Sequence, residues 1–297
     1  MKQLRKIPMI LQFGFESQID NLLTLIGTID LNKVKKIKTL KEVQTEYHLL
    51  IQKMQRRTPG GEPGTVNVIT DFDKAKALRP LFVNDSLLDD KMQADVITET
   101  KDDEANEKKA LILRAIHELG LYSEVHKALF DTLITDIFIL PSALAKAGST
   151  SQAIGVIWAN PKMTYSQHDM VEILVHEMTH HAMFIDEVRY VHYSYSAVTD
   201  KSTWARSAIL NVPRPLDKVL HSAVVATEVL LMRANYIGHP VLTKVHPPTN
   251  VMLTQLRDAI ASTEKVLLRY KGARKIFTDR ANEIFDNVRQ QVKALAA

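Results

Sequence analysis

The chain has 297 residues, 45% of them hydrophobic and 24% charged, a composition typical of a globular protein with one large domain or two smaller ones. Its net charge of +4 is mild, and the basic run at residues 33–38 is interleaved with apolar residues like the solvated face of a helix, so we expect no nucleic-acid partner. The absence of cysteine excludes disulfides and thiolate chemistry, and any metal must be held by nitrogen and oxygen ligands.

The N-terminal segment carries basic residues, but the apolar stretch behind them is short and is interrupted by Gln12 and Gly14. This pattern is not that of a signal peptide, and no later apolar run is long enough to span a bilayer. We therefore expect a cytoplasmic protein without a membrane partner. The sequence does not indicate an oligomeric state.

The first part of the chain, residues 1–133, is predicted to be a helical region. A loop rich in Pro and Gly at residues 56–64 is the strongest break in it, and the pattern from 66 to 100 is ambiguous. Gly120 is expected to separate the last two helices. Apolar residues at helical spacing predict four helices, at residues 19–26, 34–54, 107–119 and 122–134.

The pattern changes at residue 134, where strands are predicted at 134–141 and 153–158 with a loop through 148–151 between them. Ser166 and Asp169 form a capping pair for the helix that follows. This strand-to-helix order is similar to the local layout of zincin-like folds, in which a strand edge can hold an extended peptide. Residues 134–297 are expected to form the metal-binding catalytic region, in one unit with the helical region.

Residues 186–212 are rich in Tyr, Ser and charge, and their aromatic side chains could either line a substrate cleft or cap the rim of the core. An apolar helix then runs from 216 to 236, and two further helices are predicted at 249–270 and 275–295. The expected fold is mainly α (α+β), a helical domain with a small sheet beside a zincin-like metal helix.

The motif His176-Glu177-Met-Thr-His180 lies in the predicted helix after the second strand. Residues four apart lie one above the other on a helix, so His176 and His180 can offer two imidazole nitrogens to one ion. Glu177 points about a hundred degrees away and can reach water or substrate on that ion. The flanking residues are apolar, and burying these polar groups is costly unless an ion satisfies them. We therefore predict a metal site, with the adjacent His181 in a structural or supporting role.

A third ligand is expected from the apolar helix downstream, and the sequence leaves two candidates open. His221 and Glu228 are seven residues apart and lie on nearly the same face of that helix. Glu228 would complete the two-His, one-carboxylate set of a zinc peptidase, and His221 would give three nitrogen ligands.

Two motifs together resemble a known family. The His-Glu-x-x-His motif, followed by Trp204-Ala-Arg206 and by the segment 213–221, Pro-Arg-Pro-Leu-Asp-Lys-Val-Leu-His, is similar to the HExxH-type 2-oxoglutarate-dependent peptide β-hydroxylases of ribosomal-peptide biosynthesis. The resemblance covers about residues 134–233. The chain departs from the family pattern near Lys218 and after His221, where Ser222 stands in place of glycine.

This resemblance implies oxidative chemistry on a peptide side chain. Fe(II) would be held by His176, His180 and His221, and 2-oxoglutarate would be converted to succinate. The distal carboxylate of 2-oxoglutarate needs a fixed cation, for which Arg214 and Arg206 are the candidates because of their place beside His221.

Two further functions stay open from the sequence. The chain could be a zinc metallopeptidase in which Glu177 is the general base, whereas in the hydroxylase Glu177 would only orient a ligand or water. It could also be a non-catalytic relative with a structural metal or none. The sequence does not identify the peptide substrate or the residue that is modified.

Overall fold

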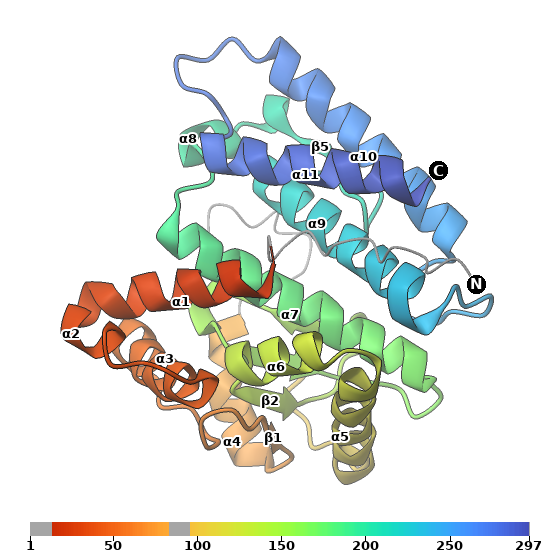
Figure 1. Ribbon diagram of the computed structural model, residues 1–297. Coiled ribbons are helices and arrows are strands. Elements are labelled where there is room, and N and C mark those ends of the chain that lie inside the picture. Colours follow the sequence, from red (N-terminus) through yellow and green to blue (C-terminus); the bar gives the residue numbers. More distant parts are fainter. Residues whose placement is uncertain (1–13, 83–95, 297) are drawn as a thin grey trace, which may run out of the picture. The chain divides into compact units, whose positions relative to one another are not determined.

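The computed structural model describes residues 14–82 and 96–296 (Figure 1). These residues form two compact units, each with its own internal contacts. The first unit comprises residues 15–82 and 96–189, and the second comprises Gly14 and residues 190–296. Residues 134–189 thus group with the preceding helices, and the two functional regions expected on either side of 133/134 stay a prediction.

The first unit is built on a four-stranded sheet in the order β1-β2-β4-β3. Strands β1, β2 and β4 are parallel, and β3 pairs antiparallel to β4 at one edge. The two predicted strands are confirmed, but β3 lies where a loop was predicted and β1 lies in the ambiguous region. The strands span Asn67–Ile69 (β1), Asp136–Ile139 (β2), Ala147–Ser149 (β3) and Val156–Ala159 (β4).

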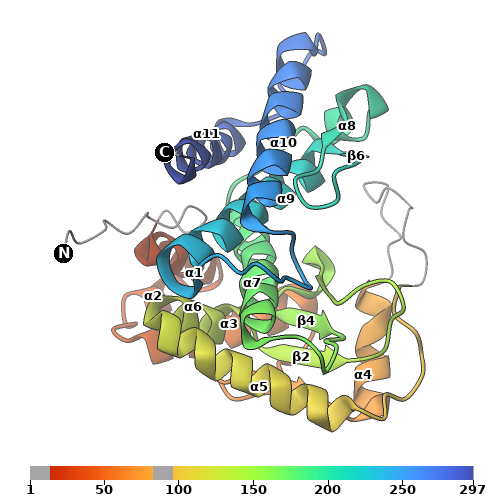
Figure 2. The same cartoon turned by 90° about the vertical axis from the view of Figure 1, so that its right-hand side faces the viewer.

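Both faces of this sheet are covered. Phe138 and Trp158 belong to an apolar cluster with Ala75 of the helix α4, while Ile137 and Ile157 face side chains of α5 and α7 on the other side. Figure 2 shows these helices around β2 and β4. Burial on both faces explains why β2 and β4 read as continuous apolar runs. The helices of this unit are α1 (Phe15–Ile29), α2 (Leu31–Val34), α3 (Leu40–Gln55), α4 (Phe72–Leu78), α5 (Ala105–Tyr122), α6 (Glu124–Leu133) and α7 (Gln167–Arg189).

Side-chain caps set helix boundaries that apolar spacing did not predict. The single helix expected at 34–54 is interrupted, because Thr39 forms a capping box with Glu42 and starts α3 at Leu40. The break expected at Gly120 is also wrong. The helix α5 runs through Gly120, and Ser123 starts α6 by accepting a hydrogen bond from the backbone N–H of His126.

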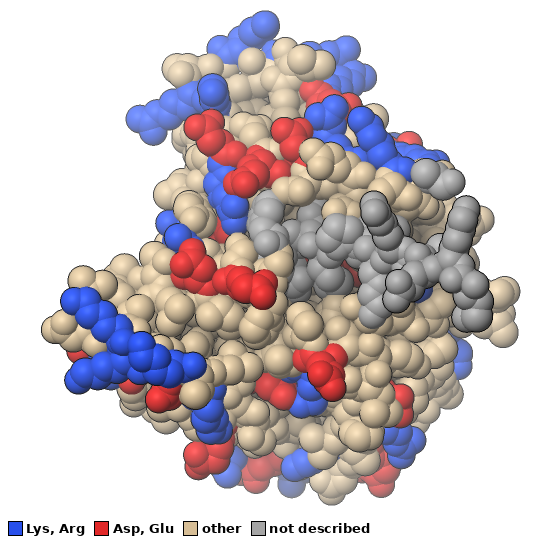
Figure 3. Space-filling model, in the orientation of Figure 1, with Lys and Arg blue, Asp and Glu red and all other residues tan. Residues whose placement is uncertain are grey.

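The basic run at residues 33–38 therefore does not lie along a long helix. Lys33 lies in the last turn of α2, and the turn that follows carries Lys35, Lys36 and Lys38, all exposed to solvent. Basic side chains gather over this part of the first unit in Figure 3. The run is solvated as expected, but on a turn.

A largely buried ion pair fixes the Pro- and Gly-rich loop to the start of β2. The carboxylate of Asp136 accepts hydrogen bonds from Arg57 Nη1 at 2.8 Å, from the Gly60 backbone N–H at 3.0 Å and from Asn67 Nδ2 at 3.0 Å. A Cβ atom on Gly60 would approach this carboxylate to 2.5 Å, so glycine is required there. The loop is thus held by one acidic side chain.

We expect Asp136→Asn to lower the free energy of unfolding by about 3–5 kcal/mol, because it leaves the largely buried Arg57 guanidinium, whose side chain is 11% exposed, without a counter-charge. The control is Glu46→Gln, which breaks the pair with Lys33 (2.8 Å), whose side chains are 21% and 43% exposed; we expect a loss below about 1 kcal/mol. Urea unfolding of both variants measures the difference. Equal midpoints would contradict the role given to Asp136.

The second unit is a helical layer with a two-stranded ribbon. The apolar helix α9 contacts both α10 and α11, and β5 contacts α10. The last helix begins at Asp279 and not at 275, because Thr278 caps it and Phe277 forms a β-bridge with Tyr193. The elements are α8 (Tyr195–Val198), β5 (Ala205–Arg206), β6 (Pro213–Arg214), α9 (Leu216–Met232), a π-helical turn (Arg233–Ile237), α10 (Thr249–Arg269) and α11 (Asp279–Leu295).

The described residues are therefore mainly helical with a small sheet, as the sequence predicted. None of their helices is both long and apolar enough to cross a membrane.

Candidate metal site

The helix α7 carries the His-Glu-x-x-His motif in its middle. Its start is fixed by the predicted capping pair, since the Ser166 backbone N–H donates to Asp169 Oδ2 (3.0 Å) and the Asp169 backbone N–H donates to Ser166 Oγ (3.1 Å). The body of the helix packs against α5, α6 and α1 and contacts β3. These contacts hold the helix in place in the first unit.

His176 and His180 lie side by side on one face of α7. Their ring centroids are 5.1 Å apart at an interplanar angle of 57°, and both side chains are only partly buried. Phe184, one turn further on, stacks on His180 with its ring centroid 6.2 Å away. The structure therefore brings together the two imidazoles that the spacing predicted, and both are nitrogen donors suited to a divalent transition metal.

Glu177 is almost fully buried, with 4% of its surface exposed. Its Oε2 accepts a hydrogen bond of 2.7 Å from the hydroxyl of Ser149, which ends β3. Burial raises the pKa of Glu177 to about 7, and the Ser149 hydrogen bond acts in the opposite direction. The carboxyl group is thus held against the edge strand of the sheet.

Ser149 was missed by the sequence analysis. It lies 28 positions before Glu177, in a segment predicted to be a loop, and a serine there carries no local signal. Only the pairing of β3 with β4 brings it to α7.

His181 has the structural role that was one of its two predicted alternatives. It is fully buried, and its Nδ1 accepts a hydrogen bond of 3.0 Å from the Gly155 backbone N–H. An accepting Nδ1 carries no proton, and burial lowers the pKa of His181 to about 3, so the ring stays neutral. It links α7 to the segment before β4.

The other predicted site residues belong to the second unit. His221 and Glu228 lie on α9, and both are buried, with exposed fractions of 7% and 0%. Across residues 14–82 and 96–296, no three side chains of His, Asp or Glu gather into a metal-binding group. His221 therefore stays a prediction for the third ligand, with Glu228 as its alternative.

The two arginines proposed for the co-substrate lie on the β5–β6 ribbon directly before α9. In its register, Arg206 pairs with Pro213 and Ala205 pairs with Arg214. Paired residues share a face and neighbours along a strand do not, so the two arginine side chains leave opposite faces. The two side chains therefore cannot bind the same carboxylate together.

The two faces have different environments. Arg206 is exposed, and its Nη1 donates to Asn211 Oδ1 in the turn of the ribbon at 3.0 Å. Arg214 is half-buried, shares its face with the buried Ala205, and lies two residues before the start of α9. Of the two, Arg214 is the better placed to bind an anion near α9.

Hydroxyl groups fix this ribbon to the helices beneath it. Ser222 Oγ accepts from the Ala208 backbone N–H at 3.1 Å and donates to the Val219 carbonyl at 2.8 Å. Ser262 Oγ of α10 accepts from the Arg206 backbone N–H at 3.1 Å. The serine that replaces the expected glycine after His221 thus anchors the ribbon to α9.

The aromatic residues of 186–212 make local contacts within the second unit. Tyr193 is buried, and its ring centroid lies 5.9 Å from that of Phe277. The Arg280 guanidinium lies 4.8 Å from the ring centroid of Tyr190. These contacts fit a role at the rim of the core, and the alternative of a substrate cleft stays untested.

Comparison with known proteins gives no relative from which a function could be transferred. A scan against protein-family models found no match, and a search of curated proteins found none either. The proposed function therefore depends on the residues of α7, α9 and the β5–β6 ribbon, together with the resemblance carried by their motifs.

Proposed function

We propose that this chain is an Fe(II)- and 2-oxoglutarate-dependent oxygenase that hydroxylates a side chain of a ribosomally made peptide. The observation that carries the proposal is the arrangement on α7. Two adjacent, partly exposed imidazoles lie on one face of the helix, as two nitrogen ligands of one ion would, while Glu177 is buried and bonded to Ser149. A carboxylate held in this way is suited to orienting its neighbours.

His176 and His180 would bind the metal, with His221 as the proposed third ligand. When bound, Fe(II) supplies the oxidation: one atom of O2 enters the peptide C–H bond and the other enters succinate as 2-oxoglutarate loses CO2. Arg214 would bind the distal carboxylate of the keto acid, where a guanidinium can make two parallel hydrogen bonds. Glu177 would keep the motif in a fixed orientation through its bond to Ser149.

The position of β3 supports a peptide as the substrate. Among the described strands it is an edge of the sheet, paired only with β4, and it contacts α7. The free edge of a strand can add an extended peptide through backbone hydrogen bonds. Such a peptide would lie beside the helix that carries His176 and His180.

A zinc metallopeptidase is the second candidate, and the state of Glu177 favours it. A pKa of about 7 matches the requirement for a general base that works near neutral pH. In this case Glu177 would take a proton from the attacking water, and either His221 or Glu228 would be the third ligand.

The products distinguish the two candidates. We would incubate the protein with a mixture of synthetic peptides, first with Fe(II), 2-oxoglutarate and O2, and then with zinc alone, and measure peptide masses. Under iron we expect peptides that gain one oxygen atom and succinate in equal amount. Cleaved peptides under zinc, with no oxygen added under iron, would replace the hydroxylase with the peptidase.

Arg214→Ala is expected to lower the affinity for 2-oxoglutarate by roughly 10²-fold or more, because a charge-assisted pair in a partly buried place is worth a few kcal/mol. Arg206→Ala is the matched control, since that side chain is exposed and leaves the other face of the ribbon. Succinate release at varied 2-oxoglutarate, with iron content measured in parallel, gives the comparison. An equal effect of both changes, or none, would remove Arg214 as the anchor.

A further inference from the structure

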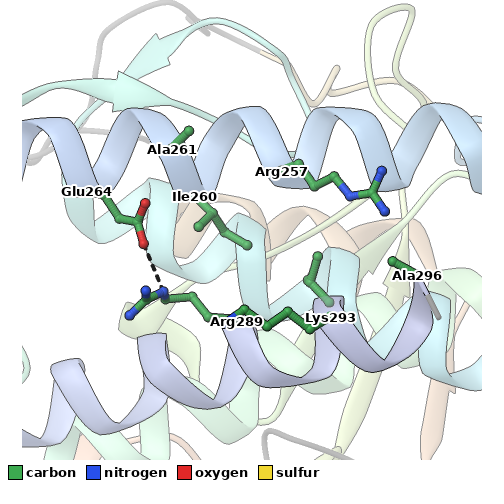
Figure 4. A pocket seen from close by; sticks show the side chains of 8 residues that line it. Arg257, Ile260, Ala261, Glu264, Arg289, Lys293 and Ala296 are labelled. Atoms are coloured by element: carbon green, nitrogen blue, oxygen red, sulfur yellow. Dashed lines mark ion pairs between the residues drawn. The ribbon is translucent and has the colours of Figure 1, made fainter.

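A groove runs between α10 and α11 in the second unit, with a volume of about 690 Å³ (Figure 4). Among the residues that the structure describes, its sides come from these two helices and from Ala296 just after α11, and apolar side chains line it, among them Ile260, Ala261 and Val292. Volumes of 300–1,000 Å³ are usual for ligand sites. The groove is therefore large enough to hold part of a partner molecule.

One end of the groove is neutralised by the chain's own acidic residues. Glu264 of α10 and Arg289 of α11 form an ion pair at 2.8 Å, drawn as a dashed line in Figure 4. Arg289 also pairs with Asp286 at 3.0 Å. With two carboxylates around one guanidinium, this end has no uncompensated cation for a ligand.

The remaining two cations of the groove are not compensated. Arg257 of α10 and Lys293 of α11 both line it and are exposed, and within residues 14–82 and 96–296 neither forms an ion pair. An apolar floor with an uncompensated cationic end is complementary to an amphipathic ligand that carries carboxylates.

The dimensions of the groove favour a helix over a small molecule. Its lining residues span 257–264 on α10 and 289–296 on α11 and its C-cap, which corresponds to about 10 Å, or two helical turns, at about 1.5 Å per residue. Ala261 and Ala296 line opposite sides, and such small residues let another helix approach closely. A groove of this kind suits apolar anchors at i, i+3, i+4 and i+7.

We propose that this groove binds a short acidic amphipathic helix of a partner peptide or protein, with its apolar face on Ile260 and Val292 and its carboxylates at Arg257 and Lys293. A second copy of the chain is a poor occupant, because the same groove would bring identical cations face to face. A nucleic acid is also disfavoured, because Glu264 and Asp286 would repel phosphates at the other end.

The test uses two labelled synthetic helical peptides of equal length, with leucine at i, i+3, i+4 and i+7. One carries glutamate and the other lysine at all flanking positions, and fluorescence anisotropy measures their binding to the full chain. We expect the glutamate peptide to bind at least about tenfold more tightly, a difference of about 1.4 kcal/mol. The binding should weaken as salt is added.

The double change Arg257→Glu with Lys293→Glu is expected to lower the affinity for the glutamate peptide by about tenfold or more. Its matched control is Lys271→Glu with Lys275→Glu, the same charge change at exposed residues of the connection between α10 and α11. An independent variant, Ala261→Trp, fills the groove without changing charge and should also weaken binding. Circular dichroism checks that all variants keep their helices.

Three outcomes would overturn the proposal. The two peptides could bind equally, the control variant could lose as much affinity as the groove variant, or laurate could bind at Arg257 and Lys293 while neither peptide binds. The last result would make the groove a site for a small amphiphilic acid. None of these outcomes bears on the α7 site, so the two proposals are tested separately.

Discussion

Replacing His176 or His180 by alanine is expected to remove bound iron and to lower succinate release by well over a hundredfold. The two rings lie 5.1 Å apart on one face of α7, so each would be one of two adjacent nitrogen ligands. Loss of a residue that only supports a metal ligand usually lowers metal affinity or activity by about 10- to 100-fold, and loss of the ligand itself should lower them further. Iron content after anaerobic loading and the rate of succinate release measure the two effects.

The matched control is His168→Ala on the same helix. His168 lies in the first turn of α7, where its Nε2 is 3.0 Å from the hydroxyl of Tyr122. We expect this variant to retain iron and turnover. If His176→Ala or His180→Ala bound iron as fully as the wild type, the motif would not be the metal site.

Glu177→Gln is expected to retain iron and measurable keto-acid turnover, with a loss of about 10- to 100-fold, because Glu177 would act by orienting its neighbours. In a zinc peptidase the same change would remove the general base, at a cost of about 10²- to 10⁴-fold in peptide cleavage. Succinate release under iron and peptide cleavage under zinc are measured on the same preparation.

Two variants at Ser149 distinguish the effect of its hydrogen bond to Glu177 from the effect of side-chain size. Ser149→Ala removes the donor to Glu177 Oε2, and Ser149→Thr keeps a hydroxyl. We expect the threonine variant to recover most of the turnover that the alanine variant loses. Zinc-dependent cleavage that disappears in Glu177→Gln, with no succinate under iron, would overturn the hydroxylase assignment.

The fold could be predicted where one face of a long helix is apolar. The helix α1 follows from such spacing, whereas α9 and the strands β2 and β4 follow from apolar runs that are buried almost throughout. Boundaries set by one polar side chain were missed, as at Thr39 and Ser123. The strand β3 has the sequence Ala-Gly-Ser, which has little strand propensity, and it forms only because β4 offers it an edge.

The same difference between local and distant information applies to the candidate site. The pairing of His176 with His180 follows from spacing along one helix. The contact of Ser149 with Glu177 depends on strand pairing between distant segments. The strand register also separates Arg206 from Arg214, which the sequence could not rank. His221 and Glu228, the two candidates for a third ligand, belong to a different unit from α7, so no local pattern decides between them.

Anaerobic metal analysis joined to a single-turnover assay for succinate tests the proposed oxygenase function most directly. Purified protein is loaded with Fe(II) without oxygen, its iron is counted, and 2-oxoglutarate and O2 are then added. We predict one iron per chain that requires both His176 and His180, and succinate that forms only when iron, keto acid and oxygen are all present. Iron that does not depend on these histidines, or an iron-loaded protein that forms no succinate, would contradict it.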